Sequence, residues 1–189
     1  FSLDLDIAGL PPGVYEGEAS LRAGDTLIYT GRAGLVKRPP NRYEIKADCE
    51  NLVVLENGRP FFPIGISGLP QSKIPEFADA GFNVCIGGDH ADYLDTAYYH
   101  GMRTLNATYH GSAPREFFRT KPPDELEAII RAGGLIPKAR VLRTHPAFFG
   151  YFWDEPGEKE SAGVAVEYRL TQEADPYHPV VPVFWQSHG

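Results

Sequence analysis

The chain has 189 residues, of which 42% are hydrophobic and 23% charged, a composition typical of ordinary soluble globular proteins. Its formal net charge of −7 argues against a nucleic-acid partner, because binding to phosphates requires a basic surface. No stretch of sequence approaches the roughly 18 consecutive apolar residues of a membrane helix, so we expect no membrane partner either.

The first 46 residues consist of short alternating runs separated by glycine and proline turns. Alternation of period two predicts strands at residues 1–7, 15–21 and 26–36. Three strands cannot close a two-sheet core. We therefore interpret residues 1–46 as the last strands of an antiparallel β-sandwich whose other strands lie upstream, or as a piece that packs on something else.

From residue 47 onward, strands and helices alternate. Residues 56–59, Glu-Asn-Gly-Arg, predict a hairpin turn before the first unit. The predicted strands are residues 61–67, 82–87, 102–108, 148–153 and 180–185, and the predicted helices are residues 73–80, 91–100, 124–131, 135–143 and 164–173.

Strands that are apolar on both faces and are followed by helices indicate a parallel sheet with helical crossovers. A closed eight-stranded barrel usually needs about 250 residues. We therefore expect an α/β fold, with residues 47–189 forming the first five units of a partial TIM (β/α) barrel. The chain begins with Phe1 rather than methionine, so a signal peptide would be absent or already removed, or the chain is an internal piece of a longer protein.

Polar and aromatic side chains follow the predicted strands of this barrel. Catalytic groups in parallel α/β folds cluster where the strands end at their carboxyl edge. Aromatic rings there can stack on sugars, and carboxylates or imidazoles can bind hydroxyls. The residues at these positions are Ser67, Asp89, His90, Tyr109, His110, Asp154, Glu155, Trp185, Gln186 and His188.

The most distinctive segment is the bulky apolar run at residues 148–153, which ends in Asp154, Glu155 and Pro156. A glutamic acid desolvated beside Trp153 would have a raised pKa and could stay protonated near neutral pH. A protonated carboxyl of this kind is what a general acid needs in order to protonate a glycosidic oxygen. The local pattern equally fits a cap for the following helix, since Asp and Glu before Pro are common at helix starts.

Three segments resemble the retaining-type clan A glycoside hydrolases. Residues 145–156, His-Pro-Ala-Phe-Phe-Gly-Tyr-Phe-Trp-Asp-Glu-Pro, resemble barrel strand four and its catalytic tip. Residues 174–180, Ala-Asp-Pro-Tyr-His-Pro-Val, resemble the lead into strand five, and residues 55–65 resemble the lead into strand one. These segments occur in the order that the family has, and a β-sandwich before the barrel is its usual layout.

The resemblance implies that Glu155 is the acid/base glutamate of a glycosidase. Asp154 departs from the family, where many members have an asparagine that bonds to the sugar 2-hydroxyl. An Asp-Glu pair also occurs in substrate-assisted N-acetylhexosaminidases, where the aspartate orients the acetamido group. The retaining mechanism instead takes its nucleophile from strand seven, which this sequence does not reach.

We therefore expect hydrolysis of an oligo- or polysaccharide, with Glu155 and Asp154 as the catalytic residues. The expected substrate-binding residues are Asp89, His90, Tyr109, His110, Trp153, Trp185 and Gln186. Either tryptophan could equally be core packing, and either histidine could equally bond to its own loop.

Several kinds of site are not expected. The histidines lack a metal-ligand spacing such as His-x-x-x-His, so we expect no metal, and the sequence predicts no other cofactor. Cys49 and Cys85 are expected to be free thiols.

The competing hypothesis is a fragment without catalytic activity, which binds carbohydrate or serves as a scaffold. Because such a half barrel exposes its strand edges, two copies could associate through the open edge.

Overall fold

A computed structural model describes residues 6–107, 113–154 and 156–183 of the chain. The chain forms two compact units, Phe1–Asn41 and Arg42–Gly189, each of which is described by itself. No helix in the described ranges is both long and apolar enough to cross a membrane.

The first unit is a two-stranded antiparallel hairpin of β1 (Gly13–Ala23) and β2 (Thr26–Lys37). The predicted strands at residues 15–21 and 26–36 lie within these two. The predicted strand at residues 1–7 is wrong at its described end, because the Asp6 carboxylate accepts a hydrogen bond from the Ala8 amide (2.8 Å) and forms a turn instead. Its first five residues lie outside the described residues.

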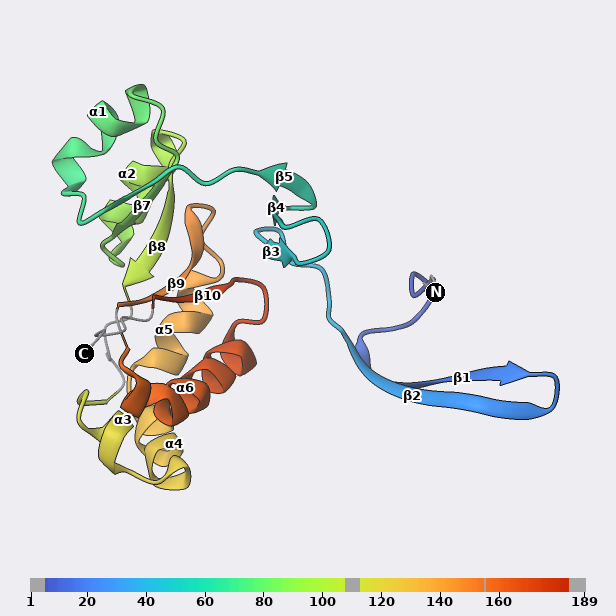
Figure 1. The fold of residues 1–189 in the computed structure, drawn as a ribbon. Coiled ribbons are helices and arrows are strands. Elements are labelled where there is room, and N and C mark those ends of the chain that lie inside the picture. The colour runs from blue at the N-terminus through green and yellow to red at the C-terminus, as the bar shows by residue number, and fades with distance from the viewer. Residues whose placement is uncertain (1–5, 108–112, 155, 184–189) are drawn as a thin grey trace, which may run out of the picture. The chain divides into compact units, whose positions relative to one another are not determined.

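The second unit contains a five-stranded parallel sheet in the order β10-β9-β8-β7-β6 (Figure 1). Its strands are β6 (Gly65–Ser67), β7 (Val84–Gly87), β8 (Arg103–Ala107), β9 (Phe148–Asp154) and β10 (Val180–Val183). Each strand pairs with the next one in the chain, as in a barrel, whereas the strand order of a doubly wound sheet reverses. The expected partial-barrel arrangement of these strands is therefore present.

Helices connect the strands of this sheet. They are the 3₁₀ turn η1 (Gln71–Lys73), α1 (Ile74–Asp79), α2 (Ala91–Tyr99), α3 (Phe117–Thr120), α4 (Pro123–Ala132), α5 (Leu135–Leu142), the 3₁₀ turn η2 (Glu158–Glu160) and α6 (Ser161–Ala174). All five predicted helices are present. The short α3 was not predicted, because one turn of helix is too short to show a periodic pattern.

The two faces of the parallel sheet have different partners. One face packs on helices, because Cys85 of β7 lies in a cluster with Tyr93 of α2, and Tyr151 of β9 lies in a cluster with Leu142 of α5. On the other face, Val84 and Phe149 pack with Ile45 and with partly buried residues of the small sheet described next. The helices α3 to α6 share a further apolar cluster built around Phe118, Leu126, Ile130 and Leu170.

The small sheet is antiparallel and consists of β3 (Ile45–Asp48), β4 (Val53–Glu56) and β5 (Arg59–Phe61). The predicted Glu-Asn-Gly-Arg turn joins β4 to β5, with positive φ angles at Asn57 (49°) and Gly58 (77°). The strand predicted at residues 61–67 is wrong as a single element. Phe61 ends β5 and residues 62–64 are not in a strand, since Pro63 has no amide hydrogen to donate to a sheet.

Candidate active site

The carboxyl ends of the parallel strands meet at one edge of the sheet. The register pairs Ser67 with Ile86, Gly87 with Asn106, and Asp154 with Val183. The segments that follow these strands therefore begin next to one another. This edge is where the predicted site residues of the sequence should gather.

Asp89 lies just past β7 and forms an ion pair with Lys138 of α5. Both side chains are about one-third exposed, at 38% and 39%. Burial lowers the pKa of the Lys138 ammonium, although the Asp89 carboxylate lies beside it. Lys138 was not singled out from the sequence, because a contact between residues so far apart leaves no local pattern.

His90 caps the start of α2. Its Nδ1 accepts a hydrogen bond from the Tyr93 amide (3.3 Å), and its ring meets the Tyr93 ring edge-on at 5.9 Å. Tyr93 in turn donates from its hydroxyl to the Leu69 carbonyl (2.8 Å). His90 is thus bonded to the first turn of the helix that follows it, and the residue remains exposed.

Trp153 lies near the end of β9, and its side chain is only 5% exposed. Pro156, on the far side of Glu155 in the sequence, is buried as well. Asp154 is described by its backbone, which pairs with β10. The other predicted site residues, Tyr109, His110, Glu155, Trp185 and Gln186, lie outside the described residues, as does His188.

A buried carboxylate that sequence reasoning missed lies close to this edge. Glu160 is 0% exposed and receives hydrogen bonds from Arg115, Arg119 and the Gly157 amide. Burial by itself raises the pKa of the Glu160 carboxyl, but these hydrogen bonds outweigh it and hold the pKa at about 2. The carboxylate is therefore charged throughout the neutral range. It follows Gly157-Glu158-Lys159, a polar stretch that resembles any exposed turn, so the sequence gives no sign of its burial.

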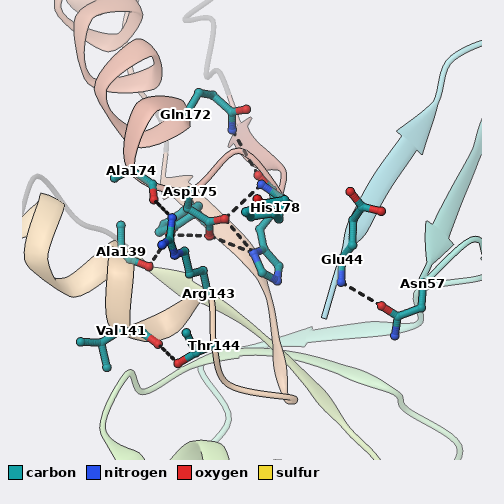
Figure 2. Close-up of polar contacts among 12 residues, drawn as sticks. Glu44, Asn57, Ala139, Val141, Arg143, Thr144, Gln172, Ala174, Asp175 and His178 are labelled. Atoms are coloured by element: carbon teal, nitrogen blue, oxygen red, sulfur yellow. Dashed lines mark hydrogen bonds and ion pairs between the residues drawn. The ribbon is translucent and has the colours of Figure 1, made fainter. Parts of the chain in front are cut away.

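A second buried network lies at the opposite edge, before the amino end of β10 (Figure 2). His178 Nδ1 lies 2.8 Å from Asp175 Oδ2, and Tyr151 donates to the same oxygen (2.8 Å). Burial, followed by the charge of Asp175, raises the pKa of the Tyr151 hydroxyl. Arg143 donates to the Ala174 carbonyl beside it (2.7 Å).

This Asp-His pair has the residue types of a catalytic dyad, but its position in the fold indicates a structural role. Both side chains are 0% exposed, so a substrate cannot reach them. In barrels the amino edge of the sheet serves stability, whereas the chemistry lies at the carboxyl edge. Asp175 and His178, from the Asp-Pro-Tyr-His-Pro run that marked the lead into strand five in the sequence, thus form a buried structural pair just before β10.

Among the described side chains, no group of three or more His, Cys, Asp or Glu residues could hold a metal ion. Cys49 is exposed and Cys85 buried, and both are free thiols, as predicted.

No protein-family profile matches the sequence, and no curated protein is similar to it in sequence. Solved structures do match the fold. A β-D-glucuronidase of Dictyoglomus thermophilum is 15% identical, with a TM-score of 0.54 over 92% of this chain and 33% of its own. A GH2 β-galacturonidase of Eisenbergiella tayi is 14% identical, with a TM-score of 0.55 over 94% of this chain and 42% of its own. A family 5 glycoside hydrolase of Bacteroides vulgatus is 16% identical, with a TM-score of 0.53 over 74% of this chain and 39% of its own.

The fold is glycoside hydrolase-like. At identities of 14% to 16%, these likenesses show the fold alone, and neither the activity nor the substrate. The chain spans between a third and about two-fifths of the length of these three enzymes. A half-barrel sheet of five parallel strands is the part of the fold that the described residues contain.

Proposed function

We propose that this chain is part of a glycoside hydrolase of clan A, in which Glu155 is the general acid and base. The observation that carries the proposal is the place of Asp154. It ends β9 at the carboxyl edge of a five-stranded parallel sheet, and Glu155 is the next residue in the sequence. Barrel enzymes have their active sites at this edge.

The proposed mechanism needs an acid with a raised pKa, and the bulky apolar residues before Glu155 in the sequence favour one. Trp153, before Asp154 and Glu155, and Pro156, after them, are both buried. The chain is therefore in the apolar interior on both sides of this pair. Desolvation disfavours the charged form of a carboxyl group. In the proposed mechanism, Glu155 protonates the leaving glycosidic oxygen and then takes a proton from the attacking water.

Two routes to the intermediate remain distinct proposals. In a retaining enzyme, a second carboxylate about 5–5.5 Å from the acid attacks the sugar, and that carboxylate would come from outside this chain. In a substrate-assisted enzyme, Asp154 orients the acetamido group of an N-acetylhexosaminide, and the substrate provides its own nucleophile. The adjacent Asp154 and Glu155 favour the second route as the one that this chain could complete with its own residues.

The test is hydrolysis of a panel of nitrophenyl glycosides, including N-acetylhexosaminides, by the chain and by its Glu155→Gln variant. We expect Glu155→Gln to lower kcat by about 100- to 10,000-fold, the range for losing a general acid. Glu125→Gln, on the exposed side of α4, is the matched control and should keep full activity.

The outcomes separate the alternatives. Activity on N-acetylhexosaminides alone, lost in both Glu155→Gln and Asp154→Asn, supports the substrate-assisted route. Full activity in Glu155→Gln would contradict the proposal. Absence of activity in the wild-type chain would contradict the substrate-assisted route, and would fit either the retaining route, whose nucleophile lies outside this chain, or a non-catalytic piece that binds or positions carbohydrate.

A further inference from the structure

Glu160 has an unusually complete set of partners for a side chain outside the predicted site. Arg115 donates from Nε (2.7 Å) and Nη2 (3.1 Å), and Arg119 donates from Nε (2.8 Å). The Gly157 amide supplies a fourth hydrogen bond (2.8 Å). These donors surround a carboxylate with no exposed surface, whereas the two arginines are 41% and 49% exposed. The group is therefore a buried anion held between two arginines that reach the surface.

The partners come from two consecutive strand-to-helix connections. Both arginines lie after β8: Arg115 is in the turn before α3 and Arg119 is within α3. Glu160 ends the η2 turn after β9. Arg115 is five residues beyond His110, and Glu160 is five residues beyond Glu155. The ion pair thus fastens together the two connections that contain the predicted site residues.

The same carboxylate also shapes its own connection. Its Oε2 accepts from the Gly157 amide, and the Glu160 amide donates to the Gly157 carbonyl (2.9 Å). Residues 157–160 therefore form a closed turn that starts two residues after Glu155. The backbone before Glu155 is held by the pairing of Asp154 with Val183, so both flanks of this residue are constrained.

Stability alone is a poor explanation for such a group. A buried ion pair often contributes less to stability than apolar side chains of similar volume would, because both charges lose their hydration. The contact between α3 and α6 also has an apolar basis, since Phe118 packs with Val166 and Leu170. What the charged pair adds is directional bonding, which fixes the two connections in one geometry.

We propose that Glu160 is a positioning residue of the proposed glycosidase site, where its ion pairs with Arg115 and Arg119 join the connections after β8 and β9. This proposal rests on the proposed function for its catalytic consequence. It acts through the backbone and not through contact with the substrate.

The first test compares Glu160→Gln with Glu127→Gln. Glu127 is a matched control because it also pairs with two arginines, Arg131 and Arg169, but on α4 at the surface. Misplacing a reacting group by about 1 Å can cost about 100-fold in rate. We therefore expect kcat to fall about 10- to 100-fold in Glu160→Gln, with KM changed less than about threefold, and no change in Glu127→Gln.

A pH profile separates positioning from general loosening of the fold. Glu160→Gln removes one negative charge from the connection that contains Glu155, and a loss of negative charge favours the ionised form of a carboxyl in the same region. The basic limb of kcat/KM should therefore move to lower pH. Glu160→Asp keeps the charge and should restore the position of that limb, even where kcat is only partly recovered.

Hydrogen exchange followed by mass spectrometry gives a readout that does not need activity. Peptides that cover residues 108–112 and 154–157 should exchange faster in Glu160→Gln than in the wild type. Their exchange rates should be unchanged in Glu127→Gln. If the wild type hydrolyses no glycoside, the substrate-assisted form of the proposed function fails, and the exchange rates still decide whether the two connections are coupled. Equal exchange in the wild type and Glu160→Gln, or wild-type kcat with an unshifted pH profile, would overturn the proposal.

Discussion

Two aspartate–histidine pairs in this chain have the same chemistry but different surroundings. Asp175 and His178 are both 0% exposed, whereas Asp95 is 74% exposed where it meets His145 at 3.2 Å. Removing one partner of a buried pair leaves the other without a hydrogen-bond partner in a place that water does not reach.

Asp175→Ala should therefore lower the free energy of unfolding by about 3 kcal/mol, since His178 loses its partner and Tyr151 keeps only the longer bond to the Ala139 carbonyl (3.5 Å). Asp95→Ala should lower it by less than about 1 kcal/mol, as for other exposed ion pairs. Urea denaturation of both variants measures the difference. Equal losses in the two variants would show that the Asp175 network does not have the structural role that we infer.

The low pKa of Glu160 predicts a particular dependence of stability on pH. The pKa is about 2 in the folded chain against 4.5 for a free glutamate, so the folded state binds this proton more weakly. The stabilisation is therefore complete above about pH 4.5 and is lost as the pH falls through about 2.

Thermal unfolding of the wild type and Glu160→Gln at several pH values should show this loss directly. The wild type should have the higher Tm at about pH 6, and the difference should shrink steadily between about pH 4.5 and about pH 2. A Tm difference that stays constant across this range would mean that the Glu160 charge contributes nothing to stability.

At the scale of elements, the approach of α6 to α3 depends on one glycine. A Cβ atom at Gly163 would lie 2.8 Å from Cα of Phe118, which is closer than real contacts allow. Gly163→Ala should therefore destabilise the chain by about 1–3 kcal/mol, even though alanine is the better helix former by about 1 kcal/mol. Gly134→Ala, at the start of α5, has no atom within 4 Å of its Cβ and should be neutral or stabilising. Chemical denaturation of both variants checks this, and a neutral Gly163→Ala would show that the two helices can separate freely.

The sequence predicted elements better than it predicted contacts. Hydrophobic periodicity was enough to predict the order of the five parallel strands and five longer helices, because each of these elements is set by its own residues. The three-residue strand β6 could not be separated from the apolar run that begins at Phe61. The sequence does not show that the residues before and after Pro63 pair with different sheets. Glu160 could not be found at all, because its burial depends on Arg115 and Arg119, which lie more than 40 residues away. Asp175 could be singled out because it belongs to a local motif, residues 174–180, although this motif forms a buried structural pair and not a catalytic site.

At the scale of the whole molecule, one face of β10 has exposed apolar side chains among the residues that the structure describes. Val180 packs on the helical side with Tyr151 and Ala174, so Val181 and Val183 point to the opposite face. They are 36% and 43% exposed, and β10 is the edge strand of the sheet in the described part of the chain. In a closed barrel, side chains on this face fill the interior. An exposed apolar edge strand is a surface on which another copy can pair.

We therefore predict that this chain associates with itself through the β10 edge. Analytical ultracentrifugation should find dimers or larger species at tens of micromolar. A double variant, Val181→Lys with Val183→Lys, should shift the chain to monomer, because charged side chains on an edge strand oppose pairing. Val141→Lys is the matched control, since Val141 is 70% exposed but lies on helix α5, away from any strand edge. It should leave the association unchanged. A wild-type chain that stays monomeric would contradict the prediction. Association lost equally in Val141→Lys would contradict the role of the β10 edge and point to the helical surface as the site of contact.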